Sequence, residues 1–232
     1  MIFELLQGGL TKNDFILILL TFPVVLISLV IHELAHGLMA KKLGDPTAKY
    51  MGRLTFNPLS HLDPLGTVSM LFFGIGWAKP VPIDPRYFKN PKKGMALVGL
   101  AGPLSNLLIA FTASLLKRAS ISIYLNVLPA SAINETSFNI LVIIVNFFYV
   151  FELLNISLAV FNLIPVPPFD GSRIFYAFLP DKYYFGVMRY ERYIMMITLV
   201  VLVSGALDVP LSRVREEISS IFDSIIGLVP GL

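Results

Sequence analysis

The stretch HELAH, residues 32–36, combines the residue types and spacing of a metal-dependent hydrolase. In an α-helix, residues four apart lie one turn above each other, so His32 and His36 present two imidazoles to one point. Glu33 projects near the same point without having to bind it. This spacing suits zinc, with the imidazoles as ligands and the glutamate as the general base that takes a proton from a zinc-bound water. We therefore expect Zn²⁺ as the cofactor and Glu33 as the catalytic residue.

The surroundings of this motif favour metal binding over a chance match. The residues before it, 15–31, include no charged side chain. A charged residue at the centre of a membrane helix costs about 2.5–3.5 kcal/mol on insertion scales, so such residues tend to be paired, ligated or turned toward a cavity. A histidine and glutamate pair that only joins helices remains the structural alternative.

A third ligand is needed, because a catalytic zinc usually has three protein ligands and one open position. The chain has no cysteine, so this ligand must be an imidazole or a carboxylate. The candidates near apolar segments are His61, Asp63, Glu152 and Asp170. Asp170 follows a long apolar segment that must break at Pro165, Pro167 and Pro168, and a helix broken at membrane depth frees backbone groups that a metal or substrate can use.

The composition is that of an integral membrane protein that positions these residues on spanning helices. Of 232 residues, 56% are hydrophobic and only 14% are charged. Apolar blocks long enough to span a membrane lie at about 15–43, 94–116 and 139–164, with a weaker one at 193–209. We therefore predict a single all-α polytopic membrane domain over residues 1–232, with about four to six transmembrane helices.

Two further regions are expected to differ from simple spans. Residues 49–87 include two extended segments around the apolar stretch 66–76, which is too short to cross as a helix. We expect a small β-hairpin or re-entrant region there, between the first and second core helices. Apolar residues recur at helical spacing over about 211–229, which predicts a C-terminal amphipathic helix on the membrane surface.

The distribution of charge predicts an orientation and excludes one class of partner. If residues 49–87 return to their starting side, most of the 18 lysines and arginines share one side, which is then cytoplasmic. The active site is expected toward that side of the cell membrane. The net charge of +3 is explained by these short basic loops, so we expect no nucleic-acid partner.

Three motifs together resemble the site-2 proteases, the intramembrane zinc metalloproteases of peptidase family M50, in their small single-domain form. HELAH is similar to the zinc motif of that family, GLAGPLSN (99–106) to its small-residue helix motif, and NLIPVPPFDG (162–171) to its N-x-x-P-x-P-x-x-D-G motif. The resemblance covers about residues 15–178, and we find no PDZ or CBS domain. Ser172 stands where many members have a second glycine.

The resemblance implies a function and a set of site residues. His32, His36 and Asp170 would hold zinc, Glu33 would be the base, and Asn106 and Asn162 would support the substrate or the oxyanion. The substrate would be a transmembrane protein in the lipid bilayer, cut within or near its transmembrane segment.

The residues themselves keep a structural alternative open for Asn106. It is the polar member of a helical face of small residues with Gly99, Gly102, Ala110 and Ala113. Such a face lets a neighbouring helix approach closely, so the amide could simply bridge two helices.

Two other functions remain alternatives to an intramembrane protease. A membrane metal-binding or metal-transport protein would also use intramembrane histidines, but it would be expected to have a path of such ligands, and the chain has only three histidines. A catalytically inactive scaffold would have no need of Glu33. Oligomeric state and substrate identity are not indicated by the sequence.

Overall fold

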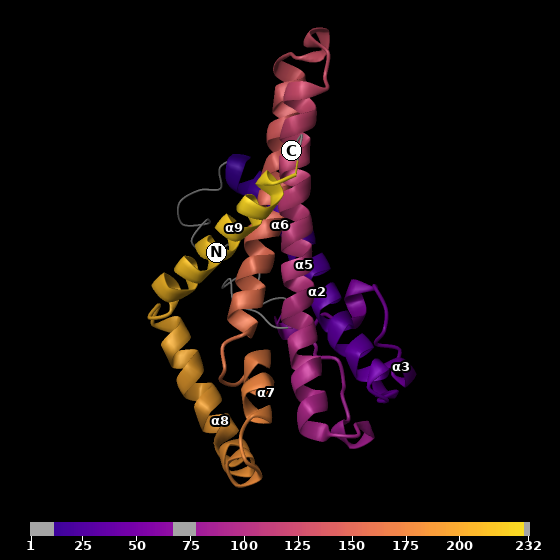
Figure 1. Cartoon of the computed structure of the whole chain (residues 1–232), viewed down its shortest axis with the longest axis vertical. Helices are drawn as coiled ribbons and strands as arrows, with labels where there is room; N and C mark the ends of the chain where they lie inside the picture. The colour runs from indigo at the N-terminus through magenta and orange to yellow at the C-terminus, as the bar shows by residue number, and fades with distance from the viewer. Residues whose placement is uncertain (1–11, 67–77, 230–232) are drawn as a thin grey trace.

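The computed structural model describes residues 12–66 and 78–229, and every regular element in these ranges is helical (Figure 1). The long helices are α2 (Lys12–Lys42), α5 (Pro91–Asn126), α6 (Glu135–Asn162), α8 (Asp181–Val203) and α9 (Asp208–Gly227). The short elements are α3 (Thr47–Tyr50), α7 (Asp170–Ala177) and the 3₁₀ turns η1 (Pro58–Ser60), η2 (Pro85–Tyr87) and η3 (Ala130–Ala132).

Helices α5 and α6 form a long antiparallel hairpin, and the other helices are arranged around it (Figure 1). Helix α2 packs on both members of the hairpin, α7 packs on α5, and α9 packs mainly on α6. Within the described ranges, three segments are long and apolar enough to span a membrane: Thr21–Lys42, Pro91–Asn126 and Glu135–Asn162. A fourth is added if Arg189–Val203 and Asp208–Gly227, bent by 81°, are counted as one span. The described residues therefore contain three or four candidate spans, and the predicted range of four to six is reached only if the bent pair counts as one span.

Local sequence signals explain where the core helices begin and end. Helix α2 ends before Gly44, whose φ of +108° is a conformation that favours glycine. Helix α6 begins with a capping box in which the Asn134 side chain accepts from the Ser137 N–H and the Ser137 hydroxyl accepts from the Asn134 N–H. Its last helical residue is Asn162, and Pro165 prevents the helix from continuing. The predicted break before Asp170 is therefore confirmed.

The small-residue face of α5 forms a helix contact. Its members are all buried: Gly99, Gly102, Asn106, Ala110 and Ala113. Because these side chains are short, α2 and α6 approach α5 closely, and the backbone of α7 reaches it as well. A Cβ added at Gly99 would lie 3.0 Å from the carbonyl oxygen of Asp170.

The predicted β-hairpin is not supported by the structure. The described residues contain no strand, and the only pairing of strand type among them is an isolated antiparallel bridge between Leu62 and Ala78. Pro80 and Pro82 follow this bridge and have no N–H to donate, so a ladder cannot be extended through them. Nearly all of the expected re-entrant stretch, from residue 67 onward, lies outside the described residues.

The C-terminal amphipathic helix is present as α9, but it packs against protein. Ile226 is buried, and the ring of Phe222 lies edge-on against Phe111 of α5, with 5.2 Å between ring centroids. Figure 1 shows α9 crossing obliquely over α6. Part of the apolar face of α9 therefore contacts the helical hairpin, while Val214, Ile221 and Ile225 are exposed, so the position on a membrane surface stays a prediction. Helix α5 is also longer than expected and extends to Asn126, ten residues beyond Leu116.

Candidate metal centre

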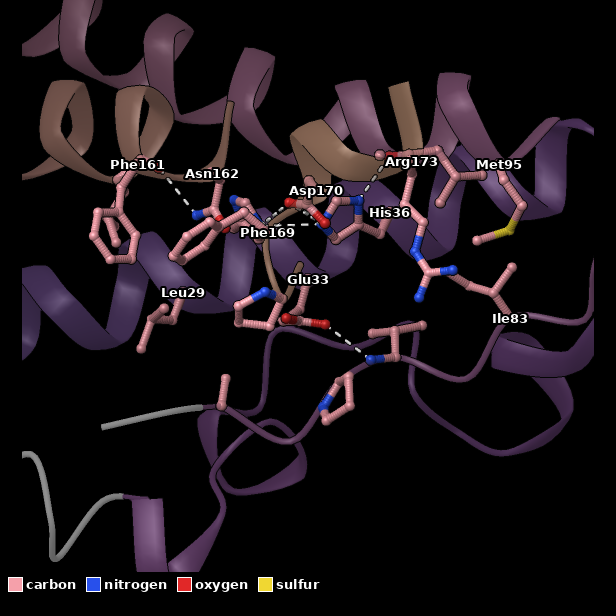
Figure 2. Close-up of a pocket in the computed structure, with 18 residues that line it drawn as sticks. Leu29, Glu33, His36, Ile83, Met95, Phe161, Asn162, Phe169, Asp170 and Arg173 are labelled. Carbon is pink, nitrogen blue, oxygen red and sulfur yellow. Dashed lines mark hydrogen bonds and ion pairs between the residues drawn. The ribbon is translucent and has the colours of Figure 1, made fainter. Parts of the chain in front are cut away.

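His32, His36 and Asp170 converge on one point between α2 and α7 (Figure 2). The Nε2 atoms of the two imidazoles are 3.0 Å apart. Each lies 3.1 Å from Oδ2 of Asp170. Both histidines are 6% exposed. We call these three residues the ligand cluster.

The geometry of the ligand cluster fits a zinc ion. Zinc bonds of about 2.0–2.1 Å in a tetrahedron place neighbouring ligand atoms about 3.3–3.4 Å apart, close to the distances observed here. The lone pairs of three such atoms repel one another unless protons or a metal ion lie between them, and a single zinc ion would satisfy all three. Among the residues that the structure describes, this is the one group of three or more metal-binding side chains that gathers in this way.

The structure distinguishes between the candidates for the third ligand. Asp170 is brought to the histidines although it is 138 positions from His32 in the sequence. His61 instead points its Nε2 at the Thr55 carbonyl oxygen, 2.8 Å away, and Glu152 is paired with Lys117. Asp63 accepts from the N–H of Gly66.

Short-range backbone structure positions Asp170. It occupies the first turn of α7, directly after the proline-rich break, and hydrogen bonds with the two imidazoles connect it to α2. A Cβ added at Gly171 would lie 2.3 Å from the Leu163 carbonyl oxygen, so the chain passes itself too closely there for any other residue. Burial favours the neutral acid, but hydrogen bonds that His32 and His36 donate when Nε2 carries a proton prevail and lower the pKa of the Asp170 carboxyl to about 2. The carboxylate is therefore charged, as a metal ligand must be.

The other ring nitrogen of each histidine also has a partner. His36 Nδ1 lies 2.7 Å from the carbonyl oxygen of Val98 and, because a carbonyl only accepts, must donate to it. His32 Nδ1 is hydrogen-bonded to Oδ1 of Asn106. Such bonds turn the Nε2 atoms toward the metal position. The contact with Val98 is made by its backbone, so no side-chain pattern in the sequence indicates it.

Gly102 makes room for both imidazoles. A Cβ at this position would lie 2.5 Å from Nε2 and Cε1 of His36 and 2.6 Å from Cε1 of His32. Any side chain there would displace the two ligands. The small-residue pattern on α5 predicts a close helix contact, but it does not reveal that the approaching groups are the metal ligands.

Glu33 faces the ligand cluster across a cavity of about 570 Å³. Its Oε2 accepts a hydrogen bond of 2.8 Å from the backbone N–H of Val81, which comes from the extended segment after residue 77 (Figure 2). This volume is within the usual range of small-ligand sites, about 300–1,000 Å³. The cavity is also lined by Leu29, Ile83, Phe161, Asn162 and Arg173.

The two asparagines predicted at the site lie in different places. Asn162 lines the cavity, and its Nδ2 donates to the carbonyl oxygen of Leu158 in its own helix, 3.0 Å away. Asn106 is fully buried behind His32 and is not among the residues that line the cavity. Only Asn162 is placed to contact a bound molecule directly.

Comparisons with known proteins agree on one family. The family model for peptidase family M50 matches residues 129–205, a range that includes Asp170. The chain is 38% identical over 205 residues to Putative zinc metalloprotease YwhC of Bacillus subtilis, and the match covers 87% of this chain and 90% of that protein. It is 31% identical over 171 residues to Zinc metalloprotease MJ0392 of Methanocaldococcus jannaschii, covering 74% of this chain and 38% of that protein. No solved structure gives a significant match.

Proposed function

Because this chain belongs to peptidase family M50, the site-2 protease family, and is a zinc metalloprotease, we propose that it hydrolyses peptide bonds within or near the transmembrane segments of other membrane proteins. The observation that carries this proposal is the position of the ligand cluster. His32 and His36 lie on a helix that is apolar enough to span a membrane, and Glu33 faces them across a cavity.

The chemistry follows from the donor set. Zinc held by His32, His36 and Asp170 would act as a Lewis acid and would lower the pKa of a water from about 15.7 to about 7. Glu33 accepts the proton that such a water loses and later passes it to the leaving amine. The Val81 N–H holds one carboxylate oxygen of Glu33 and leaves the other to accept that proton.

Asn162 is our candidate for supporting the substrate. Its amide has one bond to Leu158 in its own helix, and Nδ2 has a second hydrogen that can be donated to a peptide carbonyl oxygen in the cavity. Donors aimed at a developing oxyanion are typically worth about 10²–10³ in kcat. Asn106 is fully buried and lies on the far side of His32, so we assign it the role of positioning that ligand.

The substrate must be unwound to be cut, because a helix keeps its peptide bonds in internal hydrogen bonds. One wall of the cavity is extended chain and includes Ala78, Pro80, Val81 and Ile83. We propose that an unwound substrate strand lies along this wall by edge pairing in which the substrate N–H groups donate to carbonyl oxygens of the wall, because Pro80 and Pro82 have no N–H and the Val81 N–H is used by Glu33. Replacing Ile83 by tryptophan, which would fill space along the wall and leave the Val81 N–H on Glu33, should then reduce cleavage, and unchanged cleavage would contradict this position of the substrate.

The cleavage site is proposed to lie near the cytoplasmic face. Lys41 and Lys42 end α2 little more than one turn after His36. Basic residues gather beside the spans on the cytoplasmic side of a membrane protein. A short distance to the cytoplasm would let the released fragment leave the membrane on that side.

The decisive experiment is Glu33→Gln in the native membrane. We expect the variant to retain zinc, measured as metal content of the purified chain, while intact transmembrane substrates accumulate and co-purify with it. Glu135→Gln is the matched control, because this carboxylate is exposed at the start of α6, far from the cavity.

The same variant separates the alternative functions. A metal transporter or an inactive scaffold should work almost unchanged with glutamine at position 33. If Glu33→Gln retains zinc and no membrane protein accumulates relative to Glu135→Gln, the proposed protease function is wrong.

A further inference from the structure

A chain of hydrogen bonds behind His32 connects the ligand cluster to α6. Asn106 Nδ2 donates to Asn155 Oδ1 at 2.8 Å, and Asn155 Nδ2 donates to the Ser28 hydroxyl at 2.8 Å. Ser28 in turn donates to the Val24 carbonyl oxygen at 2.7 Å. Ser28, Asn106 and Asn155 are each 0% exposed. We call these three residues the amide relay.

The direction of the amide relay is fixed by backbone carbonyl groups, which only accept. Ser28 uses its hydrogen on Val24, so its oxygen is left to accept from Asn155. The same Nδ2 of Asn155 also donates to the Phe151 carbonyl oxygen at 2.8 Å. Both amide hydrogens of Asn155 are therefore used, and its Oδ1 must face Asn106.

The orientation of the Asn155 amide determines the orientation of Asn106 and, through it, the tautomer of His32. Because Asn155 offers an acceptor, Asn106 turns Nδ2 toward it and turns Oδ1 toward His32. An amide oxygen accepts only, so Nδ1 of His32 must carry the ring hydrogen. A neutral imidazole then has its lone pair on Nε2, which is the atom that faces His36 and Asp170.

We propose that Asn155 is a positioning residue for the zinc site, which orients the Asn106 amide and thereby holds His32 in the tautomer that binds the metal. Without Asn155, the Asn106 amide is free to turn over and present Nδ2 to His32. That orientation favours the ring with its hydrogen on Nε2, which has no lone pair for a metal. The apparent zinc affinity is then the intrinsic affinity multiplied by the fraction of chains in which His32 has the metal-binding tautomer.

The inference rests on the zinc site of the proposed function but not on proteolysis. Its test measures zinc affinity, so a chain that binds zinc and cuts nothing would leave it standing. The measurement is competition between a chelator and the full-length chain in detergent. We expect Asn155→Leu to weaken zinc binding about 10-fold, the lower end of the range for outer-shell partners. The matched control is Ser157→Ala, whose hydroxyl bonds only to Leu153 in α6.

A double-mutant cycle distinguishes an effect of Asn155 on zinc affinity through Asn106 from a general effect on the stability of α6. If Asn155 acts through Asn106, Asn155→Leu should have no further effect on zinc affinity in a chain that already contains Asn106→Leu. A loss of similar size in both backgrounds, or parental affinity in Asn155→Leu alone, would overturn the proposal.

A second variant keeps the test valid if leucine prevents folding. Asn155→Asp has the shape of the parent, and it presents an acceptor to Asn106 whether its carboxyl is charged or neutral. We expect its zinc affinity to stay within about threefold of the parent, because the Asn106 amide keeps its orientation. A loss of about 10-fold or more in this variant would also contradict the proposal.

Discussion

Two groups of side chains that include ionisable residues lie among these helices, and they differ in how their charges are arranged. The ligand cluster brings together three acceptor atoms 3.0–3.1 Å apart. The second group, which we call the charge cluster, consists of Lys117, Glu152 and Ser219. In it, both oxygens of Glu152 are used, one by the Lys117 ammonium at 2.5 Å and one by the Ser219 hydroxyl at 2.8 Å.

The difference shows how a site can be told from a structural contact. The charge cluster contains its own positive charge and joins α5, α6 and α9, so it is complete as it stands. The ligand cluster contains no lysine or arginine and borders a cavity, so it has room and donor atoms for an added metal ion. Burial of polar groups alone does not indicate function. Acceptor atoms that converge beside a cavity are better evidence of a functional site.

The largest effect is expected from a substitution that removes a member of the ligand cluster. His36→Ala removes one of three ligands, and loss of even an outer-shell partner typically costs about 10–100-fold. We therefore expect zinc to be lost from the purified chain and kcat/KM for cleavage to fall at least about 10³-fold, which is about 4 kcal/mol of transition-state stabilisation. The check is metal content together with cleavage of a substrate trapped by Glu33→Gln. Full activity in a zinc-free His36→Ala chain would contradict this assignment.

The next largest effect is expected from a substitution that breaks the ion pair of the charge cluster. Glu152→Gln leaves the Lys117 ammonium, whose side chain is 18% exposed, without its counter-charge. Breaking a buried ion pair in this way typically costs about 3–5 kcal/mol, so we expect a loss of about 3 kcal/mol in the free energy of unfolding in detergent. Zinc affinity should change by less than about twofold. The control is the double variant Lys117→Met with Glu152→Gln, which removes the stranded charge and should recover most of the stability.

The two clusters also differ in how well the sequence predicts them. HELAH carries its meaning in local spacing, because two ligands come from one helical turn. Asp170 was one of four candidates for the third ligand, and the resemblance to the site-2 proteases singled it out. The charge cluster has no such signal. The predicted span ends at Leu116, directly before Lys117, whereas α5 continues to Asn126 and Glu152 of α6 compensates the charge of the lysine. Only the tertiary structure reveals that compensation.

The β-hairpin prediction was wrong, and the position of α9 on a membrane surface stays a prediction. The β-hairpin was inferred from extended segments, but pairing requires backbone donors that Pro80 and Pro82 lack. The surface position of α9 was inferred from its amphipathic pattern. That pattern states which face is buried and does not state whether lipid or α6 buries it.

The third prediction sharpens the role of α5 in the ligand cluster. Gly102→Ala places a methyl group 2.5–2.6 Å from both imidazoles, so the rings must move. We expect zinc affinity to fall about 10–100-fold, comparable to the loss of an outer-shell partner. The matched control is Ala113→Gly on the same buried face of α5, near the charge cluster. Chelator competition should show parental zinc affinity for that control, and equal losses in both variants would mean that helix packing alone is being measured.

The smallest effect tests how α9 is attached to the hairpin. Ser219→Ala removes the donor to Oε1 of Glu152 but leaves the ion pair with Lys117 in place. Loss of one hydrogen bond to a charged, buried group costs about 1.5–3 kcal/mol when nothing replaces it, and the residual contact with Lys117 should reduce this to about 1 kcal/mol.

Ser224→Ala is the control, because that hydroxyl bonds only to Ser220 within α9. Limited proteolysis should show faster cutting between α8 and α9 in Ser219→Ala alone, because α9 separates more often from α6 while the ligand cluster keeps its zinc. Equal rates in the two variants would show that apolar contacts such as Phe111 with Phe222 suffice to hold α9 in place.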